Sequence, residues 1–266
     1  MATRYEEIAD DLRGRISKGG FPAGSTLPGY DQLVREYGTS RGTIREALKL
    51  LEVEGIVRPI KKKGLVIRDP GERRRVARGT AVRRGLRGYI FPGAATPDEP
   101  WLIEGRTATT AAPVPDSVAA LFGIEAGSEN VRRRVTSRAG TTPFQITDVW
   151  VHPEVLAEAP RVGSPAPGCL ETYLDRIEEA GHGPLEWEER TRVRLPSREE
   201  AKLLEIPSAM PVFEVTTVGT SHRTGRPTEA SVRVIPGDRV EFVTKLRRDR
   251  TARWPTGPTT DSAPSP

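Results

Sequence analysis

Three stretches in the first 55 residues repeat hydrophobic side chains with the spacing of an α-helix. In residues 5–18, one face carries a stripe of four such side chains, Tyr5, Ile8, Leu12 and Ile16. A second stretch follows Leu27-Pro28 and stops at Gly38, a residue type that commonly ends helices. In the third, Ser40 is placed to cap a helix whose buried face carries Ile44, Ala47, Leu48 and Leu51. The pattern predicts three helices that pack through these stripes.

The third predicted helix also has a basic face. Arg41, Arg45 and Lys49 fall four residues apart and point away from the hydrophobic stripe. Two short apolar runs, residues 56–60 and 65–67, then predict a β-hairpin joined by Lys61, Lys62, Lys63 and Gly64. A helix that is held by its apolar face and presents arginines from its first turns suits the major groove of DNA. We therefore predict a winged helix-turn-helix domain that binds DNA.

The remainder of the chain changes to strand-like patterns interrupted by short helices. Strands are predicted in two hairpins, residues 131–137 with 144–151 and residues 212–219 with 228–235, and as single runs at 186–195 and 240–246. Helices are predicted at residues 114–121, 170–180 and 197–204, the last with a capping box from Ser197 to Glu200. This order predicts an α+β fold with a mostly antiparallel sheet.

The charge is divided unevenly between these two parts. Residues 1–85 hold 19 Lys or Arg and 11 Asp or Glu, whereas the remaining residues hold 22 Lys or Arg and 25 Asp or Glu. The net charge of the whole chain is +5. Because neutralisation of phosphates drives nucleic-acid affinity, only the first part is expected to meet DNA. We predict a DNA-binding domain at 1–70, a basic linker at 71–85, a second domain at 86–250 and a disordered tail at 251–266, which is rich in Pro, Thr and Ser.

Several other kinds of protein are disfavoured by the composition. The amino terminus lacks the apolar core of a signal peptide, and no run approaches the roughly 20 apolar residues that span a bilayer. Cys169 is the single cysteine, and the three histidines lack the spacing of a metal site. We expect a cytoplasmic protein without a metal, a cofactor or membrane association.

Motifs on the predicted elements resemble a known family. At the amino terminus they are Tyr5-x-x-Ile8-Ala9-x-x-Leu12, Leu27-Pro28, Ser40-Arg41-x-Thr43-Ile44-Arg45-x-Ala47-Leu48-x-x-Leu51, Glu54-Gly55 and Lys63-Gly64. Further along they are Leu121 with Ile124 and Gly127, Pro143 with Asp148 and Pro153, and Gly225-x-Pro227-x-Glu229-x-Ser231. With these motifs the chain resembles a GntR-family transcription regulator of the HutC-type subfamily, whose carboxy-terminal effector module is the UTRA domain.

The resemblance implies a homodimeric repressor that binds a short inverted-repeat operator in double-stranded DNA and is released by a small-molecule effector. The DNA-binding residues expected from it are Arg35, Ser40, Arg41, Thr43, Arg45, Lys61, Lys62, Lys63 and Gly64. Two departures stand out. Gly29, Tyr30 and Asp31 replace a Ser-Glu-Arg whose arginine contacts DNA in the family, and Lys62 occupies the first glycine position of the wing.

For the effector, the resemblance implies a site built from two arginines on one strand, an acid on the next and a glutamate in the last hairpin. The matching residues are Arg134, Thr136, Asp148, Glu229 and Ser231, with Thr136 in place of the second arginine and Ile235 in place of a common tyrosine. We expect Arg134, Asp148 and Glu229 to converge on a polar ligand. Two alternatives stay open: a ligand-independent repressor of the kind that controls plasmid transfer, and an enzyme, because the UTRA module is similar in fold to chorismate lyase.

Overall fold

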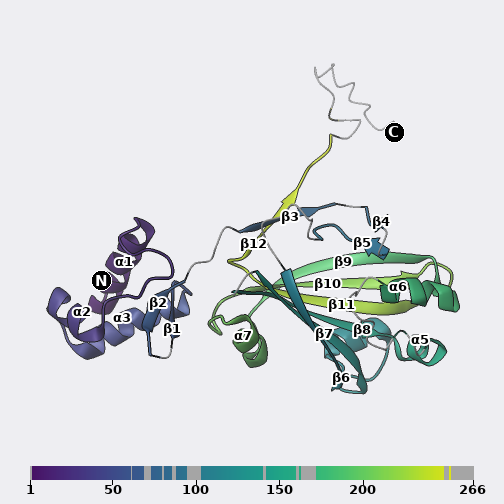
Figure 1. Cartoon of the computed structure of the whole chain (residues 1–266), viewed down its shortest axis with the longest axis horizontal. Coiled ribbons are helices and arrows are strands. Elements are labelled where there is room, and N and C mark those ends of the chain that lie inside the picture. Colours follow the sequence, from purple (N-terminus) through teal and green to yellow (C-terminus); the bar gives the residue numbers. More distant parts are fainter. Residues whose placement is uncertain are drawn as a thin grey trace, which may run out of the picture.

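The computed structural model describes residues 2–60, 62–68, 73–79, 81–85, 88–94, 103–139, 142–159, 162, 172–248 and 252. Figure 1 shows two parts, a small helical unit that contains the amino terminus and a larger unit built on one twisted sheet. The predicted tail at 251–266 lies outside the described residues except for Ala252. None of the helices in the described ranges has the length and apolar character needed to cross a membrane.

The small unit consists of the three predicted helices and the predicted hairpin. They are α1 (Arg4–Ser17), α2 (Tyr30–Tyr37), α3 (Arg41–Val53), β1 (Val57–Ile60) and β2 (Gly64–Ile67). The apolar stripes meet in one core, in which Leu12, Leu33 and Ile44 are fully buried. An ion pair outside the core links α1 to the end of α3. The guanidinium of Arg13 donates to both carboxylate oxygens of Glu54, at 2.9 and 2.6 Å.

The helix ends follow from the residues that the sequence singled out. Gly38 ends α2 in the left-handed conformation with φ 59°, which glycine adopts without a steric penalty. The hydroxyl of Ser40 then accepts a hydrogen bond from the backbone N–H of Thr43 at 3.1 Å and begins α3. This tight turn fixes the angle between α2 and α3, and therefore the direction in which α3 presents its exposed face.

The large unit is a six-stranded antiparallel sheet in the order β6-β7-β8-β11-β10-β9. The strands are β6 (Ile103–Pro113), β7 (Glu129–Ala139), β8 (Thr142–Val151), β9 (Leu185–Arg194), β10 (Val212–Ser221) and β11 (Pro227–Pro236). Both predicted hairpins, β7–β8 and β10–β11, are present. The edge strand β6 was not predicted, because its sequence IEGRTATTAAP lacks an alternation of apolar and polar residues.

Helices cover both faces of this sheet. On one face α4 (Asp116–Phe122) packs on Trp150 and Ala230, while α7 (Arg198–Leu204) packs on Ile146 and Val234. On the other face α6 (Thr172–Ile177) packs on Val149 and Val151. Figure 1 shows α7 below the sheet and the segment from β3 to β5 above it. A site on this sheet therefore belongs to one face or the other.

The helix termini of the large unit also follow the sequence. The capping box of Ser197 and Glu200 begins α7, as predicted. The predicted helix at 170–180 appears as α6 followed by the π-helical turn η2 (Glu178–His182), in which Gly181 has φ 95°. A further short helix, α5 (Pro153–Glu158), follows β8 and had not been predicted.

The segment interpreted as a basic linker contains regular structure. Residues 74–78 form β3 (Arg74–Arg78), which pairs in parallel with β12 (Val240–Thr244), and β4 (Arg83–Gly85) pairs with β5 (Gly88–Ile90). The sequence did not reveal β3, because its partner lies more than 160 positions away. Just before it, Arg68 is buried and ion-paired with Asp238 at 3.0 Å.

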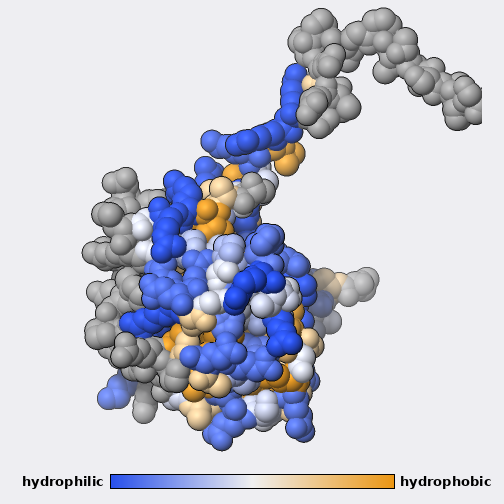
Figure 2. Space-filling model, turned by 90° about the vertical axis from the view of Figure 1, so that its right-hand side faces the viewer, coloured by the Kyte–Doolittle hydropathy of each residue, from blue (hydrophilic) through white to orange (hydrophobic). Residues whose placement is uncertain are grey.

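Figure 2 views the molecule along its long axis from the end opposite the small unit of Figure 1. Most of the coloured surface there is hydrophilic, and the hydrophobic residues appear as separate small areas. This surface is ordinary for a protein exposed to water on that side.

Candidate nucleic-acid interface and ligand pocket

The basic face of α3 is exposed, as the sequence predicted. Arg41 and Arg45 project from its first two turns, and the Arg41 side chain is 64% exposed. The nearest carboxylate to Arg41 is Asp31 on α2, at 3.8 Å, an exposed and therefore weak ion pair. Arg35 is also exposed, on the last turns of α2. These guanidinium groups are therefore accessible from solvent.

Ser40 and Thr43 lie at the start of α3. Besides its capping bond, the hydroxyl of Ser40 lies 2.9 Å from the hydroxyl of Thr43. This contact gives both residues a structural role, which is to hold the first turn of α3 in shape. Ser40 is exposed and Thr43 is half-buried.

The hairpin tip presents two exposed lysines, Lys62 and Lys63. Lys62 adopts a left-handed conformation with φ 69°, and Gly64 has φ 92°. A lysine is strained in this region whereas glycine is not, which gives a physical meaning to the departure from the wing pattern at Lys62. Lys61 lies outside the described residues.

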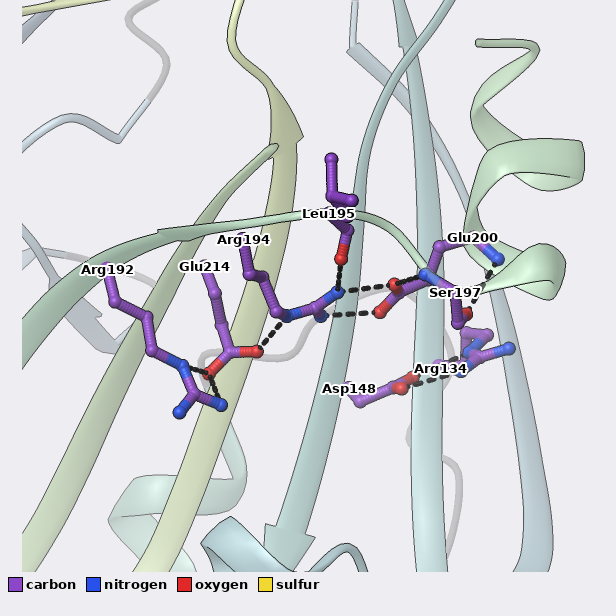
Figure 3. A network of polar contacts seen from close by, with 8 residues as sticks. All are labelled: Arg134, Asp148, Arg192, Arg194, Leu195, Ser197, Glu200 and Glu214. Atoms are coloured by element: carbon purple, nitrogen blue, oxygen red, sulfur yellow. Dashed lines mark hydrogen bonds and ion pairs between the residues drawn. The ribbon is translucent and has the colours of Figure 1, made fainter. Parts of the chain in front are cut away.

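Arg134 and Asp148 form a tight pair on neighbouring strands. The guanidinium of Arg134 donates to both carboxylate oxygens of Asp148, each at 2.7 Å, and also to Glu199 on α7 at 2.5 Å. Figure 3 shows this pair beside a second network, in which Arg194 joins Glu200 to Glu214. All of these carboxylates already have arginine partners, so the group is a structural network that ties α7 to the sheet.

The predicted convergence of Arg134, Asp148 and Glu229 is wrong. Asp148 stands opposite Val232 in the β8–β11 ladder, whereas Glu229 stands opposite Val151. Side chains alternate between the two faces of a strand, so an odd separation in register places Asp148 and Glu229 on opposite faces. Arg134, opposite Asp148, and Thr136, two residues on, share the face of Asp148. The three residues Arg134, Thr136 and Asp148 therefore do not reach the pocket that contains Glu229.

That pocket lies on the other face, beneath α6 and β5. It has a volume of about 170 Å³ and is lined by Tyr89, Phe91, Ala94, Thr147, Val149, Tyr173, Leu174, Thr217, Glu229, Ser231 and Arg233. Glu229 and Ser231, both expected from the sequence, are among them. The lining combines an aromatic wall with hydroxyl groups and one carboxyl and one guanidinium group, a composition typical of sites for small polar molecules.

Glu229, the acid of the pocket lining, has 1% of its surface exposed. The hydroxyl of Tyr173 donates to its carboxyl group at 3.0 Å. Burial raises the pKa of Glu229 to about 7, despite hydrogen bonds that act in the opposite direction. Gly219 makes room for it, because a Cβ atom there would lie only 2.8 Å from Oε1 of Glu229.

Several pocket residues were missed by the sequence analysis. Arg233 follows Glu229 and Ser231 on the same face of β11, so the alternation along this strand was a signal that could have found it. Tyr173 lies on α6 and Thr217 on β10. Their place in the pocket depends on contacts between elements that are far apart in the sequence, so no local pattern pointed to them. Arg133, next to the predicted Arg134, is the arginine of β7 that faces α6, where its guanidinium lies 5.5 Å from the ring centre of Tyr173.

Two family models match the chain over the parts just described. Residues 4–67 match the bacterial regulatory proteins of the gntR family, and residues 108–241 match the UTRA domain. The first match contains α1 to β2, and the second contains β7, β8, β10 and β11. The exposed basic helix falls in the first matched domain. Most of the pocket lining falls in the second, whereas Tyr89, Phe91 and Ala94 precede it.

Three curated relatives are similar to this chain over different lengths. The HTH-type transcriptional regulator SCO4628 of Streptomyces coelicolor is 26% identical over 260 residues, covering 95% of this chain and 91% of its own. The HTH-type transcriptional regulator GgaR of Escherichia coli K12 is 25% identical over 240 residues, covering 90% and 89%. The mannosyl-D-glycerate transport/metabolism system repressor MngR of Escherichia coli K12 is 35% identical over 65 residues, covering 24% and 27%.

In structure, a GntR-family transcriptional regulator in a crystal is similar with a TM-score of 0.56 and 24% identity, covering 92% of this chain and 98% of the other. This likeness supports the fold, including the antiparallel sheet behind the helix-turn-helix. The matched domains and the curated relatives show that the chain belongs to the GntR family of bacterial regulatory proteins and is a DNA-binding transcriptional regulator with a carboxy-terminal UTRA domain.

Proposed function

We propose that the protein is a cytoplasmic repressor that binds a short inverted repeat as a homodimer and leaves it when a small effector occupies the UTRA pocket. The name of the relative MngR supports the repressor role. The pocket supports release by an effector, because it places a carboxyl group that is 1% exposed, and that accepts a hydrogen bond from Tyr173, among aromatic and hydroxyl side chains. This buried carboxyl, Glu229, is the observation that carries the proposal.

On the DNA side, Arg41, Thr43 and Arg45 read base edges from α3, as guanidinium groups do when they bind guanine in the major groove. Arg35, Ser40, Lys62 and Lys63 hold the phosphate backbone, and Gly64 lets the wing approach it. Apart from the half-buried Thr43, these residues are exposed, which supports these roles. Lys61 belongs to the same proposal on sequence grounds alone.

On the effector side, the proposed ligand is a small polar molecule with hydrogen-bond donors. Such groups suit the carboxyl of Glu229 and the hydroxyls of Ser231 and Thr217. An acidic group on the ligand suits Arg233 at the other end of the same strand face. The aromatic residues Tyr89, Phe91 and Tyr173 enclose the body of the ligand.

The experiment measures operator binding in the presence of small molecules from cells. Full-length protein is bound to a fluorescent operator duplex, and a deproteinised low-mass cell extract is added while anisotropy is followed. Wild type should be released, whereas Glu229→Gln should bind the operator with unchanged affinity and stay bound. The matched control is Glu186→Gln, whose side chain is 70% exposed on β9 and which should be released like wild type.

The other outcomes separate the alternatives. If the extract neither releases wild type nor raises its melting temperature, the protein is a ligand-independent repressor. If a component of the extract is converted to a new product, as followed by mass spectrometry, the UTRA domain is an enzyme. Loss of folding in Glu229→Gln together with weaker operator binding would assign Glu229 a structural role instead.

A further inference from the structure

One carboxylate, Glu189 on β9, is shared by two arginines from different parts of the chain. Arg233 of β11, which lines the pocket, contacts it from one side. Arg78, at the end of β3, contacts it from the other. The side chains of Arg78, Glu189 and Arg233 are 19%, 28% and 20% exposed, so the three charges are largely withdrawn from water.

The second arginine belongs to the segment that leads from the DNA-binding unit to the UTRA sheet. β3 begins six residues after Arg68, whose guanidinium donates to Gly55 at the end of α3 and pairs with Asp238. Arg78 also donates to Thr191 at 2.7 Å and stacks 4.1 Å from the ring centre of Phe242 on β12. The side chain of Arg78 therefore links the connecting strand β3 to β9, an edge strand of the sheet.

β3 also touches the wall of the pocket. Arg74 donates to the carbonyl oxygen of Gly93 at 3.1 Å, and Gly93 lies between Phe91 and Ala94, which line the pocket. This hydrogen bond connects β3 to the segment that forms part of the pocket wall.

The charge balance of the shared contact is incomplete. Two guanidinium groups meet one carboxylate, and they repel each other across a partly buried space. Burial lowers the pKa of Arg233 to about 10 and also lowers the pKa of Arg78, with the repulsion from Arg233 acting in the same direction. The carboxyl group of Glu229 also attracts Arg233, but burial raises the pKa of Glu229 to about 7, so its charge is only partial near neutral pH. A further anion beside Arg233 would remove the imbalance.

We propose that Arg233 binds the acidic group of the effector, a carboxylate or a phosphate, and that Glu189 transmits its presence to Arg78 and hence to β3. When the acid occupies Arg233, Glu189 is left to Arg78 alone and β3 is held more firmly on β9. The inference rests on the proposed function and adds to it the class of the ligand and the path of its effect. The effector acts because it binds better to the state in which β3 is fastened.

The experiment uses hydrogen exchange of the full-length chain with two simple anions. Exchange is measured for peptides that contain β3 and β11, in sodium chloride, sodium phosphate or sodium acetate at equal ionic strength. In wild type, phosphate or acetate should slow exchange in both peptides by about fivefold, and the more effective anion identifies the acidic group.

Two variants test the path. Arg78→Gln should keep the slowing in β11 and lose it in β3, whereas Arg233→Gln should lose both. The control is Arg190→Gln on β9, next to Glu189. The side chain of Arg190 is 59% exposed, and this variant should behave like wild type. As an independent variant, Glu189→Gln should leave β3 in fast exchange whichever anion is present.

The inference is overturned if β11 responds in wild type while β3 does not, if β3 in Arg78→Gln responds as in wild type, or if neither anion affects β11. Operator binding is measured on the same samples. A chain that binds all DNA sequences equally refutes the proposed function, whereas the exchange pattern decides the relay, so the two failures are distinguishable.

Discussion

Glu229 is an acid whose environment favours its protonated form. Its pKa is about 7 in the folded chain because of burial, against 4.5 for an ordinary glutamate. The folded state therefore holds a proton that the unfolded state has released once the pH exceeds about 4.5. This contribution to stability is complete below that pH, is lost as the pH rises through 7, and changes little above it.

The corresponding prediction is that Glu229→Gln flattens the pH dependence of stability. Wild type should lose free energy of unfolding between pH 5 and pH 7.5 relative to the variant, because glutamine does not ionise. Urea unfolding of both proteins at intervals across this range measures the difference. Curves that run parallel over the whole range would contradict the buried, protonated state of Glu229.

Asp148 offers a contrasting residue, because it pairs with Arg134 on the face away from the pocket. Asp148→Asn should lower the free energy of unfolding by about 1–3 kcal/mol, because it weakens a bidentate salt bridge. The side chains of Arg134 and Asp148 in that salt bridge are 14% and 18% exposed. The matched control is Glu199→Gln, which alters the other partner of Arg134 at a side chain 61% exposed and should change little.

Release from the operator decides between this structural role and a place in the pocket. Asp148→Asn should respond to the low-mass extract like wild type once it is folded. A variant of normal stability that no longer responds would return Asp148 to the effector site.

At the scale of elements, the hairpin of β1 and β2 is expected to act on phosphates rather than on bases. Replacing Lys62 and Lys63 by glutamine should weaken binding to operator and unrelated DNA by similar factors. The slope of log affinity against log salt should become shallower by roughly 0.9 for each lost contact. Titrations at several salt concentrations measure it, and an unchanged slope would mean that the hairpin points away from DNA.

Elements with local signals were predictable from the sequence. α1, α2 and α3 follow from apolar stripes, from Gly38 and from the cap at Ser40, and the hairpins follow from alternating runs. β3 and β6 were not, because β3 depends on a distant parallel partner and β6 is an edge strand without alternation.

The candidate site was predictable only in part, for a reason that concerns register. Glu229 and Ser231 were expected from the resemblance, through the motif Gly225-x-Pro227-x-Glu229-x-Ser231, and both line the pocket. Arg134 and Asp148 were assigned to the same site because they match the arginine and the acid of the family pattern, but the face that each presents depends on register to within one residue. Arg133 and Val149, their immediate neighbours in the chain, are the residues that face α6.

At the scale of the whole molecule, polar contacts between described residues join the two units. Arg58 on β1 pairs with Glu205 after α7 at 2.9 Å, and Arg68 pairs with Asp238. In the proposed homodimer, such contacts set the distance between the two copies of α3. A ligand that strengthens or weakens the contacts of β3 with β9 would therefore change the distance between the two copies of α3, and with it their fit to an inverted repeat.

The most direct test of this account is equilibrium binding of the full-length chain to an operator selected from random duplexes, compared with a scrambled duplex of equal length. Wild type should bind the operator at least about a thousandfold more tightly, with two chains per inverted repeat. Arg45→Ala should lose about 1–3 kcal/mol on the operator only, whereas Arg190→Ala, on the exposed edge strand β9, should lose nothing. Equal affinity of wild type for both duplexes, or operator binding by Arg45→Ala that matches wild type, would contradict the account.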